Sequence, residues 1–380
     1  MDNEKQPNVI DELQKFLEEL ESLAPKREDV SGSKIGYRAV IGEEMINDSL
    51  PEESVVDIDG LEAEESGRVI SIEELPQASD FQITQPGPIA AVDCGIVRLG
   101  ETENGLVITM RAAIVVEDGE KSGVSIFRTG PIYLHNHYKL KVLHRIGAHL
   151  GKPDFFVEMD ITDVNNPKPI RVKRGVADDA HQYGDRFRNW LERLTQRIAV
   201  TFVENGTILL DGALTLRTRD TPNSYYDELA RLAGMKGNSI IAISKQSMLQ
   251  VNGKPVRFWL NDLPNRVCYR SLSPMMRKEG IERVYGNAYA SRFSLLGPTF
   301  RMDVKPVDGQ TDDEAINRFY SSSLMRGGYP DILVRSHTYS YFTSPDVIQL
   351  QAQAGAKYRL VPQPEIDLSG IFAPFGGRFK

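Results

Sequence analysis

Two aspartates each follow a short apolar run that is typical of a buried strand. Residues 89–92 lead into Asp93, residues 207–210 lead into Asp211, and small residues come directly after both. A carboxylate carried on a strand is held more precisely than one in a loop. Two carboxylates held side by side repel one another, so such a pair favours a divalent cation. Asp-Gly after a strand is also a common turn, and either motif alone leaves that alternative open.

A glutamate from the helix between these strands would complete a set of oxygen ligands for Mg²⁺ or Mn²⁺. We assign Glu192, because it lies on the predicted helix over residues 183–203, directly before the second strand. Glu204, in the turn that follows that helix, is the fallback. Two ions about 3.5–4 Å apart would activate water and stabilise the leaving oxygen. The sequence therefore predicts a site for two divalent ions.

A second group of chemically capable residues lies near the C-terminus, where a Gly-Gly-Tyr-Pro motif at 327–330 precedes His337. Pro330 can open a helix at its first turn, which would place Tyr329 and His337 about two turns apart and roughly on one side. His337 could then bind a metal or carry a proton, and Tyr329 could bond a phosphate or stack on a base. A lone histidine or tyrosine is more often a packing residue.

The elements that must position these residues change in character along the chain. Strands are predicted over 89–92, 106–116 and 124–127, followed by helices over 183–203, 224–235 and 312–326 and strands over 207–210 and 239–243. A meander followed by alternating helices and strands predicts an α/β fold, a mixed sheet flanked by helices. Residues 131–180 are interpreted as an elaboration of this core, which spans residues 86–360 and leaves 361–380 as a tail.

The N-terminal region has a different composition from the core. Apolar residues recur at three- and four-residue spacing over 10–23, which predicts an amphipathic helix over 1–25 that packs on the body or on a partner. Residues 26–85 form an acidic connector, with short strands predicted around 37–41 and 68–72. Residues 1–80 contain 22 acidic and 7 basic residues, and residues 81–380 contain 31 acidic and 38 basic residues. The net charge of −8 therefore does not exclude phosphate binding by the body.

Several protein classes are disfavoured by what the sequence contains. No apolar run is long enough to span a membrane, and residues 1–5 lack the pattern of a signal peptide. Two cysteines, Cys94 and Cys268, are too few for a disulfide framework. We expect a cytoplasmic protein with no membrane association.

The order of short motifs resembles that of the NurA nuclease family. That pattern opens with a strand running into Asp-Gly-Gly, continues with a helix carrying a Glu and a strand ending in Asp-Gly, and closes with Ser-Lys, Ala-Arg-Phe and Gly-Tyr-Pro to His segments. Over about residues 86–355 this chain has Asp93-Cys94-Gly95, Glu192, Asp211-Gly212-Ala213-Leu214, Ile243-Ser244-Lys245, Ala290-Ser291-Arg292-Phe293 and Gly328-Tyr329-Pro330 through His337. It departs from the pattern at Cys94, which could crowd a metal, and at the inserted Ser291.

The resemblance implies a ribonuclease H-like fold and a metal-dependent DNA nuclease, acting as a single-strand endonuclease and a 5′-to-3′ exonuclease in DNA end processing. Carried over by motif, Asp93, Glu192, Asp211 and His337 would hold Mn²⁺ or Mg²⁺, and Tyr329 would act beside them. To these we add Lys245 and Arg292 as contacts to DNA phosphates. Surface charge is the alternative for both.

The resemblance also implies partners: DNA with single strands or ends, a second copy in a homodimer, and a HerA-type hexameric ATPase. The sequence contains no GxxxxGK[ST] motif, so the motor would be a separate chain. The N-terminal helix and acidic arm are candidate docking elements for it.

Two other functions remain open at this point. One is a non-catalytic NurA-like adaptor that binds DNA for such an ATPase, for example in a defence system. Cys94 is the only feature that favours this adaptor. The other is a guide-directed ribonuclease H-like nuclease of the Piwi type, which the lack of room for guide-anchoring domains disfavours.

Overall fold

The computed structural model describes residues 76–135, 180–215, 223–278 and 284–362, except 103–104, 120, 246, 248 and 252, together with 14, 15, 18 and 35–39. Several predicted features fall outside these residues: the strand around 68–72, most of the elaboration over 131–180 and the tail after 362. Of the N-terminal helix, only Gln14, Lys15 and Glu18 are described, and they are helical and exposed.

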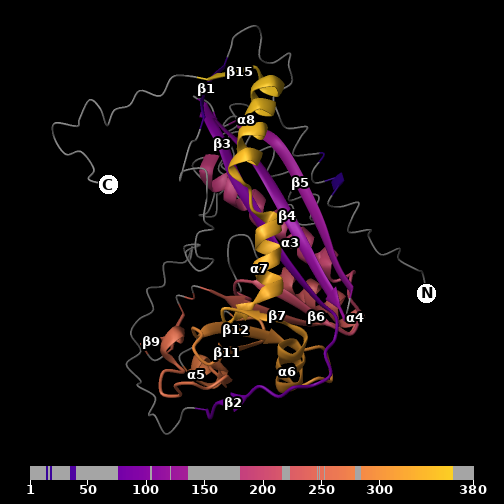
Figure 1. The fold of residues 1–380 in the computed structure, drawn as a ribbon, viewed down its shortest axis with the longest axis vertical. Helices are drawn as coiled ribbons and strands as arrows, with labels where there is room; N and C mark the ends of the chain where they lie inside the picture. Colours follow the sequence, from indigo (N-terminus) through magenta and orange to yellow (C-terminus); the bar gives the residue numbers. More distant parts are fainter. Residues whose placement is uncertain are drawn as a thin grey trace, which may run out of the picture.

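Three long antiparallel strands form the spine of the molecule (Figure 1). They are β3 (Ile89–Thr102), β4 (Gly105–Asp118) and β5 (Lys121–His135), which pair in sequence order as the predicted meander. β3 is much longer than the predicted strand, because it continues beyond Asp93 paired with β4. The prediction that Asp93 ends a strand is therefore wrong: Asp93 lies inside one.

The rest of the main sheet extends from the first half of β3. Two short strands, β6 (Thr207–Asp211) and β7 (Ser239–Ser244), follow parallel to β3. Antiparallel strands then continue the sheet in the order β12 (Phe300–Lys305), β11 (Asn287–Arg292), β10 (Cys268–Ser271) and β2 (Ser79–Asp80). Asp211 is the last residue of β6, as predicted. β6 therefore ends at the level of Asp93, while β3 continues beyond it.

A second, smaller set of strands borders the far end of β3. β1 (Ile35–Ala39) pairs with residues 100–101 of β3, and β15 (Leu360–Pro362) pairs with β1. The strand predicted around 37–41 is thus present two residues earlier. Because β4 occupies one edge of β3 along its length, β6 and β1 share the other edge and leave residues 93–99 between them.

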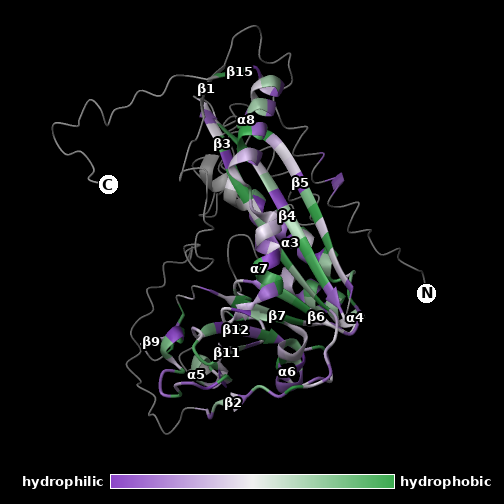
Figure 2. Ribbon diagram, viewed as in Figure 1, coloured by the Kyte–Doolittle hydropathy of each residue, from purple (hydrophilic) through white to green (hydrophobic). Residues whose placement is uncertain are grey.

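Helices cover both faces of the sheet, and a hydrophobic core lies between the sheet and each layer of helices. On one face, α3 (Ala180–Ala199) packs on the even-numbered residues 90–96 of β3, and α4 (Asn223–Met235) packs beside it on β7. On the other, α7 (Asp331–Ser340) packs on β3 and α6 (Asp312–Ser322) packs on β12. α8 (Ser344–Tyr358) covers the far half of β3. Figure 2 shows hydrophobic residues along β4, β6 and β7, between these layers. The mixed sheet flanked by helices confirms the predicted fold class.

Smaller elements surround the sheet. They are β8 (Gln250–Val251), β9 (Lys254–Pro255), a 3₁₀ turn (Val256–Phe258), α5 (Ser273–Lys278), β13 (Met325–Arg326) and β14 (Tyr329–Pro330). The helix predicted over 312–326 ends at Ser322, because the next residues pair as the β13–β14 hairpin around Gly327 and Gly328. None of the described helices is long and apolar enough to cross a membrane.

Candidate active site

Asp93 and Asp211 are brought together by the pairing of β3 with β6. Val92 lies opposite Leu210 in this parallel pair, so the next position on each strand is an aspartate. Successive side chains on a strand alternate between faces, and Ile89, Ala91 and Leu209 belong to the core beneath α6 and α7. Both aspartates therefore point to that same face, at the place where β6 ends and β3 continues.

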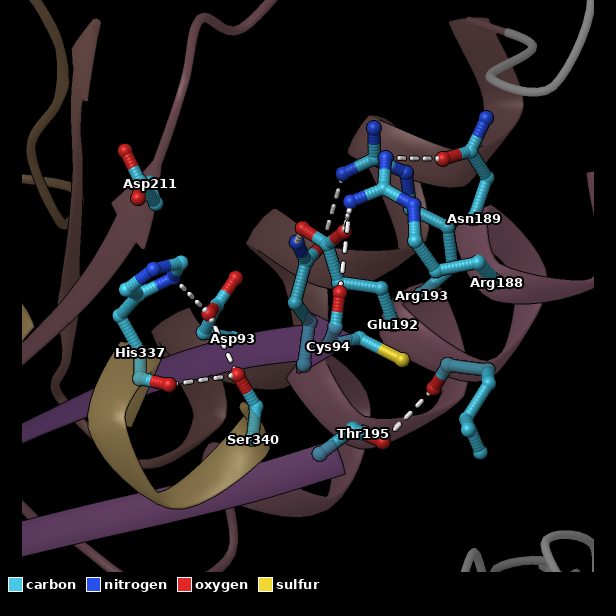
Figure 3. Close-up of polar contacts among 12 residues, drawn as sticks. Asp93, Cys94, Arg188, Asn189, Glu192, Arg193, Thr195, Asp211, His337 and Ser340 are labelled. Carbon is cyan, nitrogen blue, oxygen red and sulfur yellow. Dashed lines mark hydrogen bonds and ion pairs between the residues drawn. The ribbon is translucent and has the colours of Figure 1, made fainter. Parts of the chain in front are cut away.

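Helix α7 crosses β3 directly over Asp93, and Gly95 permits the close approach. A Cβ atom at Gly95 would lie 2.5 Å from the main-chain oxygen of Ser340, in the last turn of α7. Any side chain there would push the helix away from the strand. Gly95, two residues after Asp93, thus serves the packing of α7, which sets His337 and Ser340 above the carboxylate (Figure 3).

The carboxylate of Asp93 is held from two positions on α7. Nδ1 of His337 lies 2.9 Å from Oδ2 of Asp93, and Oγ of Ser340 donates to the same oxygen at 2.6 Å. Burial alone would raise the pKa of Asp93, but these hydrogen bonds and the positive charges of His337 and Arg188 lower it to about 2. The pKa of His337 is raised, chiefly by its hydrogen bond to Asp93 and against the effect of burial. Half of the imidazole side chain remains exposed, at 55%.

Asp211 is held by one cation and one phenol. Nζ of Lys245 lies 2.5 Å from its Oδ2, and the Tyr329 hydroxyl donates to its Oδ1 at 3.0 Å. Burial raises the pKa of Asp211 and the nearby Asp93 adds to the increase, while Lys245 and Tyr329 oppose it. Lys245 follows the end of β7, so its position is set by the same parallel pairing that places Asp211.

Glu192 reaches the site from the opposite face of the sheet. It lies on α3 beside the core residues Leu191 and Leu194, and although it is a charged residue it is only 5% exposed. Gln196 donates to its Oε1 at 3.0 Å, and the Tyr225 hydroxyl donates to Gln196 at 2.6 Å. Figure 3 shows Glu192 next to β3, with arginines of α3 beyond it.

The pKa of Glu192 responds to both aspartates. Burial raises the pKa of Glu192; Arg188, whose Nη1 is 3.8 Å from Oε2, and Arg193 oppose that shift, and the negative charges of Asp93 and Asp211 increase it. Protein cations now lie beside all three acids. Three mutually repelling carboxylates are a donor set suited to a hard divalent cation.

Their present arrangement is not a closed metal cage. Among the residues that the structure describes, no three Asp, Glu, His or Cys side chains form a group that could hold an ion as they stand. Asp211 is turned to Lys245, and Asp93 is turned to His337 and Ser340. The donor types fit Mn²⁺ or Mg²⁺, and binding would require Lys245 and His337 to give up these contacts.

The turn after Asp211 is fixed by a buried ion pair on β12. The Leu214 amide donates to Oδ2 of Asp303 at 2.8 Å, and Asp303 is fully buried. Nε and Nη2 of Arg301 donate to the two oxygens of the same carboxylate at 2.9 and 2.8 Å. Gly212 begins the turn with a φ of 110°, and its amide donates to the oxygen of Ile243 at 2.9 Å. The end of β6 therefore has little freedom to move.

These features can be compared with known proteins. The sequence matches no protein-family model and no curated protein. This chain is similar in structure to NurA nucleases. NurA from Sulfolobus solfataricus shares 16% identity and a TM-score of 0.47, with 74% of this chain and 87% of that chain covered.

Two further solved structures show how far the similarity extends. NurA bound to dAMP and manganese shares 8% identity, with a TM-score of 0.39 and 70% of this chain and 88% of that chain covered. Endonuclease V from Ciona intestinalis, in complex with inosine-containing DNA, shares 9% identity, with a TM-score of 0.34 and 79% and 100% covered. Because identity to NurA and to endonuclease V is low, we assign residue roles from the geometry of this chain alone.

Two of the candidate residues, the added phosphate contact and the fallback ligand, lie elsewhere. The guanidinium of Arg292 is buried and donates to the main-chain oxygens of Leu263 and Leu260 at 2.6 and 2.9 Å. Its predicted phosphate contact is wrong, because these oxygens hold the charged group inside the protein. Glu204, the fallback ligand, is paired with Lys236 at the start of β6, at the opposite end of that strand from Asp211.

Cys94 does not crowd the site, contrary to expectation. It is 2% exposed and packs in the core beneath α3, on the face opposite Asp93. Figure 3 shows its sulfur directed away from His337. Burial raises the pKa of the Cys94 thiol well above its ordinary value, which leaves it as a protonated packing residue.

Four residues around the NurA-like motifs were not predicted: Ser340, Arg188, Gln196 and Asp303. Ser340 lies three residues after His337, and Arg188 and Gln196 lie four residues before and after Glu192, so helical spacing from each assigned residue could have found them. Asp303 is 89 residues from Leu214, and only the register of β12 with β7 brings it there.

Proposed function

We propose that this chain is a metal-dependent nuclease that hydrolyses phosphodiester bonds in DNA. The observation that carries the proposal is that Asp93 and Asp211 each lie one residue beyond the paired Val92 and Leu210. His337 on α7 contacts Asp93, and Glu192 on α3 is close enough for both aspartates to raise its pKa. The motif order that resembles the NurA family supports the same reading. The nuclease domain comprises residues 86–360 in this proposal.

Each residue has a role that follows from its position. Asp93, Asp211 and Glu192 hold Mn²⁺ or Mg²⁺, with His337 as a further donor. Two bound ions would supply a nucleophile at neutral pH and stabilise the charge on the leaving oxygen. Lys245 moves from Asp211 to a phosphate oxygen when a cation takes its place, because its flexible stem is exposed at the site. The Tyr329 hydroxyl keeps Asp211 oriented and is available to a phosphate.

The finer features rest on the family resemblance. They are cleavage of single strands, 5′-to-3′ removal from ends, a homodimer and a HerA-type hexameric ATPase that feeds DNA to the nuclease. Residues 1–25 are the proposed docking element for that motor. If deleting residues 1–25 left binding of the motor unchanged, that assignment would be wrong.

The first test is cleavage of a 5′-labelled single-stranded DNA by the wild type with Mn²⁺, with Mg²⁺ and with EDTA. We expect cleavage with a divalent ion and none with EDTA. A 3′-labelled strand in parallel gives the direction of digestion. Cleavage that persists in EDTA would contradict the proposal.

A non-catalytic, DNA-binding adaptor for the ATPase is the second candidate. The observation in its favour is Lys245, whose ammonium lies on Asp211 where a cation would bind. An adaptor predicts DNA binding without cleavage in every metal, even with the ATPase and ATP added. The position of Cys94 in the core removes the feature that favoured this candidate in the sequence.

A further inference from the structure

The turn between β11 and β12 presents two leucines to solvent. Leu295 is 56% exposed and Leu296 is 91% exposed. The turn itself is ordered by a hydrogen bond from the Gly297 amide to the Ser294 oxygen at 3.1 Å. A fixed turn that holds two large apolar side chains in water suggests a surface that something else covers.

This turn lies at the same sheet edge as the candidate active site. Arg301, at the start of β12, pairs with Ser244, and Ile243 pairs with Asp211. β12 is the second strand from β6, so the turn begins about 10 Å along the edge from Asp211, two strand spacings away. The leucines are therefore within reach of a strand that places one phosphate at the carboxylates.

The β13–β14 hairpin connects the turn to the site. A Cβ atom at Gly328 would lie 2.7 Å from Oγ of Ser294 and 3.2 Å from Cα of Gly297, so the two turns touch. The next residue is Tyr329, which bonds Asp211. The hairpin is therefore packed between Asp211 and the turn, with Gly328 and Tyr329 buried beneath the path from the carboxylate to Leu296.

Cationic side chains flank this path. Arg326 pairs with Tyr329 across the hairpin and is 65% exposed, with its Nε 2.6 Å from Asp331. Nζ of Lys245 lies 5.1 Å from the centre of the Tyr329 ring. Cations beside an apolar surface are the combination that binds single strands, because the cations contact phosphates and the apolar groups contact base faces. In a duplex those faces are stacked on one another, so this combination favours unpaired bases.

We propose that Leu295 and Leu296 pack against unpaired bases of the strand whose phosphate lies at Asp93 and Asp211, while Lys245 and Arg326 contact its backbone. This assignment rests on the proposed nuclease function. It adds a contact to bases, without sequence readout, to a site otherwise built for phosphates.

The test compares binding of two labelled single strands of equal length by fluorescence anisotropy in EDTA. One strand has normal bases, and the other has abasic residues, which keep the phosphates and remove the base faces. The proteins are the wild type, the double variant Leu295→Ser/Leu296→Ser, and Met235→Ser. Met235 is a matched control, because it is 58% exposed but ends α4 at the opposite edge of the sheet.

We expect the wild type to bind the normal strand about tenfold more tightly than the abasic strand, as burial of one leucine would give. The double variant should bind both strands as the wild type binds the abasic one. Met235→Ser should behave as the wild type.

Equal wild-type affinity for both strands would overturn the base contact. A double variant that loses affinity for both strands alike would do the same. Either result would leave the nuclease proposal standing. Concentration-dependent self-association that the double variant lacks would assign the leucines to a second copy of this chain and overturn it as well. Cleavage of the normal strand by the wild type in Mn²⁺ is measured alongside. A wild type that neither binds nor cuts DNA overturns the nuclease proposal and the base contact together.

Discussion

His337 and Asp93 lie 244 residues apart in the chain, yet Nδ1 of His337 is 2.9 Å from Oδ2 of Asp93. The contact depends on how closely α7 crosses β3, which Gly95 permits. A substitution that moves the helix should therefore damage the site without touching any proposed ligand.

Gly95→Ala tests this dependence. Its Cβ would meet the main-chain oxygen of Ser340, which cannot move without moving α7. We expect a loss of about 1–3 kcal/mol in the free energy of unfolding, as for other overpacked sites, and at least a tenfold loss of cleavage rate. Gly123→Ala on β5 is the control, because no atom lies within 4 Å of its added Cβ. Equal behaviour of the two variants would show that α7 does not depend on Gly95.

The pKa of Asp93 predicts how the stability of the metal-free protein depends on pH. The pKa is about 2 in the folded protein and ordinarily about 3.9 in an unfolded chain. The stabilisation is therefore complete above the unfolded pKa and is lost as pH falls through the folded one. His337 has a raised pKa and stays protonated in this acidic range.

Urea unfolding of the wild type and Asp93→Asn at pH 5 and pH 3 measures that loss. Between pH 5 and pH 3 the free energy of unfolding of the wild type should fall by about 1 kcal/mol more than that of the variant, because the variant has no carboxylate to protonate. A difference that stays constant with pH would show that Asp93 is not held as an anion by His337 and Ser340.

Lys245→Ala should strengthen metal binding and weaken cleavage. Removing the ammonium from Asp211 frees that carboxylate and takes a positive charge away from the cation. We expect Mn²⁺ to bind about tenfold more tightly, measured by electron paramagnetic resonance, and cleavage to slow by about tenfold as a phosphate contact is lost. Lys236→Ala is the matched control, because the Lys236 side chain is as exposed as that of Lys245 and pairs with Glu204 near the other end of β6. Weaker Mn²⁺ binding by Lys245→Ala would contradict the role given to this lysine.

Asp303 should position Asp211 as well as stabilise the sheet. Asp303→Leu alone leaves Arg301 charged and buried, so we expect a loss of about 3–5 kcal/mol in the free energy of unfolding. The double variant Arg301→Met/Asp303→Leu should recover most of that stability, because an apolar pair can replace a buried ion pair. It would still lack the acceptor for the Leu214 amide, so Mn²⁺ affinity and cleavage should remain reduced. If Mn²⁺ affinity and cleavage recovered together with the free energy of unfolding, Asp303 would have only a structural role.

Local sequence patterns predicted most helices and strands and named the candidate carboxylates. The strand lengths and the partners of the buried polar side chains depend on contacts between distant parts of the chain. Asp211 at a strand end and Glu192 on α3 follow from apolar periodicity, which the sequence displays directly. The length of β3 does not, because pairing with β4 carries that strand through Gly95 and beyond the point where the apolar run stops.

The error at Arg292 has a similar cause. Its motif is local, but its partners, Leu260 and Leu263, are main-chain oxygens from about thirty residues earlier. No pattern in one sequence indicates that a guanidinium will be turned inward by carbonyl groups. Likewise, the side of β3 on which Cys94 lies follows from strand alternation only once the strand is known to continue past Asp93.

Cleavage of 5′-labelled single-stranded DNA by Asp93→Asn in Mn²⁺ is the measurement that tests the central claim most directly. Asparagine preserves the shape and the packing under α7 but removes the charge that would hold a cation. We predict a rate about a hundredfold to a thousandfold below that of the wild type, the range seen when one preorganised electrostatic group of an active site is lost. A variant that cuts within threefold of the wild-type rate would contradict the claim that Asp93 is a metal ligand of a nuclease.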